Sequence, residues 1–139
     1  MYIKILENII AKEYIKTQES FKNILDDLYI TEWFDEKIVK IYLLFNDDND
    51  DIVSFSLLSK MNKDPLKKHT NPYYLSYIYT FEKYRRKKLA TELLTNIKKD
   101  LEITVFCTND NNKNLFENTG FIFLNFDNLY NSFPIYRFP

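Results

Sequence analysis

The sequence predicts an α/β (α+β) fold in which a mixed central β-sheet is flanked by helices. Three observations lead to this prediction. Apolar residues recur at helical spacing in two long stretches, β-branched and aromatic residues gather in several short runs, and the two kinds of stretch alternate along the chain. The expected order is β-α-β-β-β-α-β-α-β-β. At 139 residues we expect one domain that spans residues 1–139.

The first half of the chain predicts a strand, a helical region and a β-hairpin. Met1–Leu6 is a short apolar strand, and Ile9–Tyr29 carries apolar residues at helical spacing, as one helix or two. Ile38–Phe45 is apolar on both faces, as expected of an internal strand. Ile52–Lys60 is its predicted partner across the polar turn Asn46–Asp51.

The second half begins with a polar loop, Met61–Pro72, which leads into the strand Tyr73–Thr80. A helix is expected from about Arg86 to Leu101, because its leucines and isoleucine share one face. Gly120, the single glycine, is predicted to end a short helix in the left-handed conformation. The remaining expected elements are a strand at Ile103–Thr108, the short helix up to Asn118, and strands at Phe121–Phe126 and Phe133–Phe138.

Composition narrows the classes of function. The net charge of −1 and the pI near 5.9 indicate that the molecule as a whole is not a polyanion binder, so any basic function must be local. A single cysteine excludes an intrachain disulfide and a thiolate metal cage. No apolar run approaches the roughly 20 residues that span a bilayer, and the charged N-terminal residues do not suit a secretion signal. We therefore expect a cytoplasmic protein with no metal cofactor.

Four consecutive cations lie where the strand Tyr73–Thr80 gives way to a helix, in the segment Tyr84-Arg85-Arg86-Lys87-Lys88-Leu89-Ala90. The first turn of a helix has unpaired N–H groups and the positive end of the helix dipole, so cations there are unfavourable unless an anion is present. Arginine and lysine side chains add charge-assisted hydrogen bonds to phosphate oxygens. The junction therefore predicts a site for a phosphate-bearing ligand.

This segment and a second one resemble the motifs of the GNAT superfamily of acyl-CoA N-acyltransferases. Its members bind the CoA pyrophosphate with an Arg/Gln-x-x-Gly-x-Gly/Ala loop, and Arg85-Arg86-Lys87-Lys88-Leu89-Ala90 is similar to it in place and spacing. Their second motif is an Asn before a short helix that ends Leu-Tyr-x-x-x-Gly-Phe. Asn109 followed by Leu115-Phe116-Glu117-Asn118-Thr119-Gly120-Phe121 is similar to that motif. Both segments occur in order between Tyr73 and Phe126.

The resemblance implies a GNAT-like fold, acetyl-CoA as co-substrate, and N-acetyltransferase activity in which a primary amine attacks the thioester directly. The pantetheine arm would pair with the main chain of the strand at Ile78, Tyr79 and Thr80. A backbone N–H of this strand would stabilise the developing oxyanion. The implied cofactor-binding residues are Ile78, Tyr79, Thr80, Arg85, Arg86, Lys87, Lys88, Leu89, Ala90, Thr91, Asn109 and Phe116.

Two positions depart from the family pattern. Lys88 stands at the central glycine of the loop, where a left-handed conformation costs a residue with a Cβ roughly 1 kcal/mol. Phe116 stands where members often have a tyrosine that protonates the departing thiolate. We therefore assign no catalytic residue. His69 is a candidate base for the incoming amine, although a lone loop histidine is more often only solvated. Tyr130 and Tyr136 are candidate replacement acids, supported only by their place near the C-terminus, and Cys107 is expected to be a buried structural thiol rather than a nucleophile.

The residues suggest three other interpretations. The first is a catalytically silent GNAT-fold module that binds CoA weakly or acts through protein contacts, which Lys88 and Phe116 motivate. The second is nucleic-acid binding by the cations and neighbouring tyrosines, which the slightly acidic net charge disfavours. The third is a calcium loop at Asp47, Asn49 and Asp51, which lacks the glycine and glutamate that such a loop requires. The amine acceptor and the oligomeric state are left open.

Overall fold

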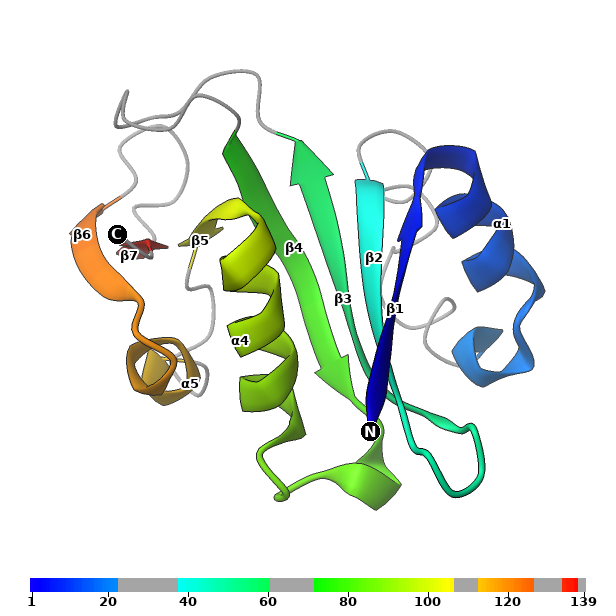
Figure 1. The fold of residues 1–139 in the computed structure, drawn as a ribbon. Helices are drawn as coiled ribbons and strands as arrows, with labels where there is room; N and C mark the ends of the chain where they lie inside the picture. Colours follow the sequence, from blue (N-terminus) through cyan, green and yellow to red (C-terminus); the bar gives the residue numbers. More distant parts are fainter. Residues whose placement is uncertain (23–37, 61–71, 107–112, 127–133, 138–139) are drawn as a thin grey trace.

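The computed structural model describes residues 1–22, 38–60, 72–106, 113–126 and 134–137, and its elements follow the predicted order (Figure 1). The strands are β1 (Tyr2–Glu7), β2 (Ile38–Phe45), β3 (Ile52–Lys60), β4 (Pro72–Thr80), β5 (Glu102–Phe106), β6 (Ile122–Phe126) and β7 (Pro134–Arg137). The helices in the described ranges are α1 (Asn8–Thr17), α4 (Leu89–Asp100) and α5 (Lys113–Asn118), with 3-10 turns at Glu19–Phe21 and Glu82–Tyr84.

The described strands form one seven-stranded sheet in the order β1-β2-β3-β4-β5-β7-β6. Neighbouring strands are antiparallel except β4 and β5, which run parallel, so the sheet is mixed as predicted. The β4–β5 ladder is short and runs from Pro72↔Glu102 to Tyr74↔Thr104. The carboxyl-terminal part of β4 therefore extends beyond its ladder with β5.

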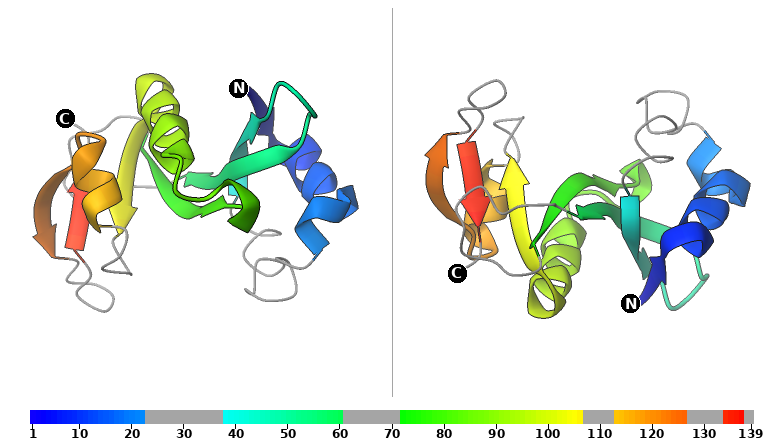
Figure 2. Two further views of the ribbon diagram at one scale, coloured as in Figure 1. Left: turned by 90° about the horizontal axis from the view of Figure 1, so that it is seen from below. Right: turned by 90° about the horizontal axis from the view of Figure 1, so that it is seen from above.

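Helices cover both faces of the sheet (Figure 2). On one face, Leu93 and Ile97 of α4 and Phe116 of α5 are buried in a common core. On the other face, α1 buries Ala11 and Ile15. Each large apolar side chain buried in this way contributes roughly 1.5–3 kcal/mol, so the two cores hold α4 and α1 firmly against the sheet.

The position of β2 between two hydrophobic cores explains why its sequence is apolar on both faces. Tyr42 and Leu44 belong to the core under α4, whereas Ile41, Leu43 and Phe45 belong to the core under α1. The predicted bounds of β2 and β3 are confirmed. The polar turn between them is also confirmed and is closed by backbone hydrogen bonds at both of its ends.

Helix α4 begins later than predicted. The expected start was Arg86, but the helix begins at Leu89, because Arg86 and Lys88 have positive φ angles of 66° and 57°. Left-handed residues cannot belong to a right-handed helix. The C-terminal end agrees with the prediction within one residue, since Leu101 is extended with φ −129°.

The first helical region is interrupted. Within the predicted stretch Ile9–Tyr29, α1 ends at Thr17, Gln18 is extended, and a 3-10 turn follows at Glu19–Phe21. The break turns Phe21 into the core, where its ring contacts that of Phe55 edge-on at 4.8 Å between ring centres. The rest of this predicted stretch lies outside the described residues, as do the predicted loop up to residue 71 and the candidates His69, Cys107 and Tyr130.

Gly120 confirms the prediction of a left-handed helix end. Its φ angle is 90°, and two backbone hydrogen bonds close the turn, from the N–H of Gly120 to Glu117 and from the N–H of Phe121 to Phe116. The rings of Phe116 and Phe121 also meet, with centres 6.1 Å apart. This combination is the Schellman motif, in which a glycine ends a helix and the flanking apolar residues touch.

Candidate functional site

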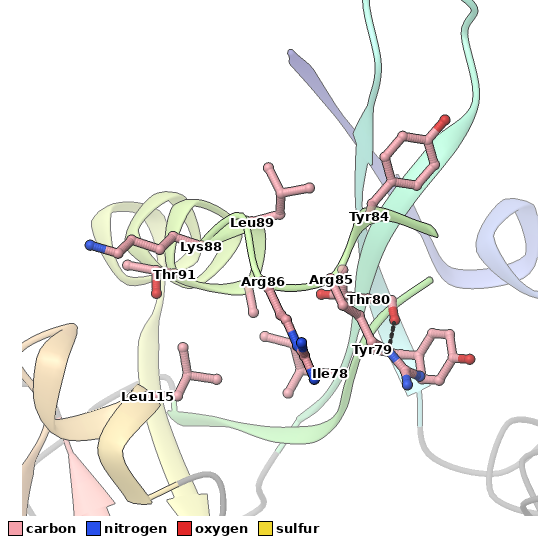
Figure 3. A pocket seen from close by; sticks show the side chains of 11 residues that line it. Ile78, Tyr79, Thr80, Tyr84, Arg85, Arg86, Lys88, Leu89, Thr91 and Leu115 are labelled. Atoms are coloured by element: carbon pink, nitrogen blue, oxygen red, sulfur yellow. Dashed lines mark hydrogen bonds between the residues drawn. The ribbon is translucent and has the colours of Figure 1, made fainter. Parts of the chain in front are cut away.

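A pocket of about 500 Å³ lies between the carboxyl-terminal part of β4 and the N-terminal end of α4 (Figure 3). It is lined by Ile78, Tyr79, Thr80, Tyr84, Arg85, Arg86, Lys88, Leu89, Ala90, Thr91 and Leu115. Three of the lining side chains are cations and none is a carboxylate. The charge of the pocket therefore favours an anionic ligand.

The loop that enters α4 has an energetically costly backbone. Arg86 and Lys88 are both left-handed although neither is glycine, at a cost of roughly 1 kcal/mol for each. A left-handed residue next to a helical one turns successive N–H groups toward the same side and forms a concave anion-binding nest. Lys88, with φ 57° and ψ 29°, followed by helical Leu89 is such a pair. Lys88 thus has the conformation that glycine normally supplies.

Helix α4 begins in this turn without a side-chain cap. The residue before the helix is Lys88, whose side chain has no oxygen with which to accept a hydrogen bond from the first N–H groups. Leu89, Ala90 and Thr91 form the first turn of α4, and all three line the pocket. Their N–H groups and the helix dipole are therefore presented to the pocket, as at phosphate sites on helix N-termini.

The neighbouring cations are placed differently from one another. Arg85 turns back onto β4, where its Nε donates a 2.9 Å hydrogen bond to the carbonyl of Thr80 and its guanidinium lies 5.2 Å from the centre of the Tyr79 ring. Among the described residues, the side chains of Arg86 and Lys88 have no hydrogen-bond or ion-pair partner. In Figure 3 the Arg86 side chain extends from the loop toward β4, and that of Lys88 extends to the opposite side.

Lys87, which was predicted to bind the cofactor, is not among the residues that line the pocket. Its ammonium lies 6.0 Å from the centre of the Tyr84 ring. Of the four consecutive cations, Arg86 is therefore the one whose side chain is both on the β4 side of the loop and without a partner among the described residues.

The end of β4 is hydrogen-bonded from two directions. Ser54 of β3 donates to the carbonyl of Tyr79 at 2.8 Å and lies 3.1 Å from the hydroxyl of Thr80. With Arg85 on the Thr80 carbonyl, both of these carbonyls already accept a hydrogen bond from the chain itself. Of the three predicted main-chain positions, Ile78 is thus the one for which no such side-chain hydrogen bond is found in the described ranges.

An irregularity in β4 changes which of its side chains lie on the α4 side of the sheet. Leu57 and Leu58 are adjacent in β3 but pair with Tyr77 and Leu75, so β4 has one extra residue between these pairs. This β-bulge puts Leu75 on the α4 side of the sheet and Tyr77 on the α1 side. A regular strand would place residues 75 and 77 on one face, so the bulge cannot be inferred from the alternation of the sequence.

The pocket brings together most of the predicted cofactor-binding residues. Those that line it are Ile78, Tyr79, Thr80, Arg85, Arg86, Lys88, Leu89, Ala90 and Thr91. Phe116 is 3% exposed and belongs to the core under α4, and its neighbour Leu115 lines the pocket instead. Asn109 lies outside the described residues.

Tyr84 is a pocket residue that the sequence interpretation did not select. It is 7% exposed, its hydroxyl donates a 2.8 Å hydrogen bond to Asp51, and the amide of Asn49 donates to that hydroxyl at 3.3 Å. The partners come from the turn between β2 and β3, more than thirty positions earlier in the chain. An aromatic residue directly before a cationic run was the only available signal.

The described part of the chain has neither a cluster of metal-binding side chains nor a membrane-spanning helix. Within those ranges, no three His, Cys, Asp or Glu side chains gather as a metal site would require. In the same ranges, no helix is long and apolar enough to cross a membrane. Tyr136 lies in β7, where its backbone pairs with Val105 and Phe123.

Comparison with protein families gives one match that covers most of the chain. The sequence model of the acetyltransferase (GNAT) family matches residues 5–121. The matched range contains both segments that resemble GNAT motifs, and it includes β4, the loop and α4. A comparison with curated proteins finds no significant match.

Solved structures resemble this fold over nearly its whole length. Arabidopsis thaliana NAA60 in complex with acetyl-CoA has a TM-score of 0.59 at 15% identity, covering 97% of this chain and 96% of that chain. A histone acetyltransferase HPA2 and related acetyltransferase from Corynebacterium glutamicum has a TM-score of 0.58 at 16% identity, covering 100% and 97%. The KacTA–DNA complex has a TM-score of 0.60 at 12% identity, covering 98% and 93%. At these identities the likeness establishes the fold.

Proposed function

The chain belongs to the acetyltransferase (GNAT) family, and on that premise we propose that it moves an acetyl group from acetyl-CoA to a primary amine. The family supports acetyl transfer in general. The co-substrate is supported by a similar structure that contains acetyl-CoA. The finer assignment depends on this chain's own pocket and on how well its residues suit a CoA pyrophosphate.

The observation that carries the proposal is the left-handed backbone of Lys88 at the start of α4. The left-handed conformation costs Lys88 energy. Binding of an anion by the resulting nest of N–H groups explains why this conformation is kept. The nest, the first turn of α4 and the partnerless Arg86 together suit a pyrophosphate, which has several oxygens and negative charge to share among them. We propose that the pyrophosphate binds the N–H groups of Lys88 to Thr91 and the guanidinium of Arg86.

The rest of the pocket suits the arm that joins the pyrophosphate to the thioester. Ile78, Leu89 and Leu115 give it apolar walls, and the main chain of β4 at Ile78 can pair with an amide of the arm. Acetyl-CoA supplies an activated acetyl group. In the proposed reaction the amine nitrogen forms a bond to the acetyl carbon, the carbon–sulfur bond breaks, and the nitrogen loses a proton as the thiolate leaves. The chain contributes mainly by positioning and by backbone hydrogen bonds.

Phe116 supports a second candidate, a GNAT-fold module that does not turn over. Its side chain has no ionisable proton, and it is buried against Phe121 rather than lining the pocket. The departing thiolate would then need a proton from another group or from water. This candidate differs from the enzyme in turnover, and a test must therefore measure binding and product separately.

The first experiment is a calorimetric titration of the purified protein with acetyl-CoA, with CoA and ATP as comparison ligands. We expect micromolar binding of acetyl-CoA and clearly weaker binding of ATP, because ATP lacks the pantetheine arm. A second assay then follows free thiol release with a panel of amines. Thiol release that depends on an amine supports the enzyme, whereas binding without release supports the silent module.

Absence of acetyl-CoA binding at millimolar concentration would eliminate the enzyme and would leave a GNAT-fold module that acts through protein contacts. A short DNA duplex belongs in the same titration, because one similar structure is a protein–DNA complex. Tighter binding of DNA than of acetyl-CoA, with an affinity that falls steeply as salt rises, would reassign the cationic loop to nucleic acid.

A further inference from the structure

We propose that the acidic turn between β2 and β3, residues 46–51, positions the anion-binding loop through a hydrogen bond from Tyr84 to Asp51. In this inference, which rests on the proposed function, Tyr84 and Asp51 are positioning residues for acetyl-CoA. Neither needs to form a hydrogen bond to the ligand. Their role is to keep the residues that follow Tyr84 in the conformation that receives the pyrophosphate.

The contact connects two parts of the chain that the sheet alone does not join. The Tyr84 hydroxyl donates to Oδ2 of Asp51 at 2.8 Å and accepts from Nδ2 of Asn49 at 3.3 Å. The Tyr84 ring belongs to the core under α4, and the ammonium groups of Lys83 and Lys87 lie 5.4 Å and 6.0 Å from its centre. Tyr84 is thus held at its ring by packing and at its hydroxyl by the turn.

The position of this anchor in the chain gives it its leverage. Tyr84 directly precedes Arg85 and stands two residues before the first left-handed residue, Arg86. Two left-handed residues without glycine cost the loop roughly 2 kcal/mol in total relative to relaxed alternatives. A hydrogen bond to a carboxylate is strong enough to offset a strain of this size. Without it, relaxed loop conformations would compete with the binding one.

The turn itself is rigid enough to serve as an anchor. The N–H of Asp51 donates to the side chain of Asn49 at 3.0 Å, and the N–H of Asp48 donates to that of Asn46 at 3.0 Å. The N–H of Asn46 also donates to the carbonyl of Asp51 at 2.9 Å. Hydrogen bonds within the turn itself therefore hold Asp51, the acceptor for Tyr84, in place.

Charge alone predicts the opposite behaviour, which makes the inference testable. A carboxylate near a phosphate site weakens anion binding by repulsion, so an Asp51 that acted only as a charge would lower the affinity for acetyl-CoA. An Asp51 that acts as an anchor raises that affinity. Replacing Asp51 by asparagine removes the charge but keeps an oxygen that can accept from Tyr84, whereas alanine removes both.

The test compares the acetyl-CoA dissociation constants of the wild type and a set of variants by calorimetry, with thermal melting as the measure of folding. For Tyr84→Phe and Asp51→Ala we expect a roughly tenfold rise in the dissociation constant, because the binding conformation of the loop becomes a minor one. Asp51→Asn should stay within about threefold of the wild type. The double variant that combines Tyr84→Phe with Asp51→Ala should bind acetyl-CoA no more weakly than Tyr84→Phe alone.

Asp48→Ala is the matched control, because it removes one negative charge from the same turn without touching Tyr84. Unchanged affinity in Tyr84→Phe and Asp51→Ala would overturn the inference. Binding of acetyl-CoA by the wild type would still support the proposed function. Tighter binding in Asp51→Ala, or a loss that Asp51→Asn does not rescue, would also overturn it. No binding by the wild type would overturn both proposals. If Tyr84→Phe does not fold, Asp51→Ala decides the matter, because Asp51 is an exposed residue.

Discussion

The two ends of α4 are held in place by different means. At its N-terminal end the helix has no side-chain cap, Lys88 is left-handed, and Arg86 has no partner among the described residues. At its C-terminal end Lys98 donates a hydrogen bond to the carbonyl of Thr119, and Asp100 accepts one from Tyr42 at 2.9 Å. The first end has open donors and strain, and the second has paired groups.

The contrast separates structural needs from ligand needs. The carbonyl of Thr119 lies in the turn that ends α5, where Gly120 takes φ 90° at no steric cost. The loop before α4 has the same handedness with lysine in place of glycine. Strain of this kind persists where the surrounding structure imposes it, and it gathers at sites that bind or react. We therefore expect changes at the first end to alter binding and changes at the second to alter stability.

The largest effect is expected for Arg86→Glu. The variant replaces the partnerless guanidinium by a carboxylate facing the pyrophosphate, and glutamate bears the same left-handed cost as arginine. We expect acetyl-CoA affinity to fall at least about 30-fold, since a charge-assisted hydrogen bond is exchanged for repulsion. The melting temperature should change little. Titration calorimetry and thermal melting measure the two effects.

The control for that prediction is Lys99→Glu, which makes the same change in net charge at the other end of α4. It should leave acetyl-CoA affinity within about twofold of the wild type. Equal losses in the two variants would mean that the affinity follows the total charge of the protein. The distinction between the two ends of α4 would then be lost for binding.

The next effect is expected for Gly120→Ala, which should lower stability without lowering affinity. An alanine at φ 90° costs about 1–2 kcal/mol, and the Schellman turn between α5 and β6 bears that cost. Urea unfolding should therefore show a decrease of about that size in the free energy of unfolding. The folded variant should bind acetyl-CoA as the wild type does. A weaker affinity in the folded variant would show that the pocket, through Leu115, depends on this turn.

The sequence predicted the elements well because their signals are local. The bounds predicted for Ile38–Phe45 and Ile52–Lys60 agree to the residue, since two runs rich in apolar residues on either side of a polar turn leave little freedom. Gly120 was placed because a lone glycine after a short helix has one common use. The position of the pocket also followed from local signals, because a cationic run between strand and helix can be read from adjacent residues.

The remaining features depend on contacts that the sequence does not reveal. The predicted start of α4 is too early because Arg86 and Lys88 have positive φ angles, and neither arginine nor lysine is a residue type that indicates a positive φ. Tyr84 was not selected because its partner, Asp51, belongs to another turn. The expected role of Phe116 is untested, and its burial depends on which face of a six-residue helix meets α4, which so short a periodic pattern cannot decide.

An effect of similar size is expected at the C-terminal end of α4 for Tyr42→Phe. The loss of the hydrogen bond to Asp100 should lower stability by about 1–2 kcal/mol at pH 8. Burial, and then the bond to Asp100, raises the pKa of Tyr42 above its usual value near 10. A raised pKa in the folded state stabilises the protein below pH 10, and this contribution is lost as the pH rises further.

The stability difference between the wild type and Tyr42→Phe should therefore shrink by about 1.4 kcal/mol between pH 8 and pH 11. Urea unfolding at pH 8, 10 and 11 measures it, and the remaining tyrosines are common to both proteins. A difference that stayed constant with pH would mean that Tyr42 ionises as easily in the folded chain as in the unfolded one. Acetyl-CoA affinity at pH 8 should not change.

The smallest effect is expected for Lys88→Gly, and it tests the comparison most directly. Glycine removes the steric cost at φ 57° but increases the entropy of the unfolded chain, so the free energy of unfolding should rise by no more than about 1 kcal/mol. Because the N–H groups stay in place and the Lys88 side chain points away from β4, affinity should stay within about threefold. A large loss of affinity would show that the Lys88 ammonium binds phosphate. The lysine side chain would then contribute to ligand binding at a position where glycine fits the backbone better.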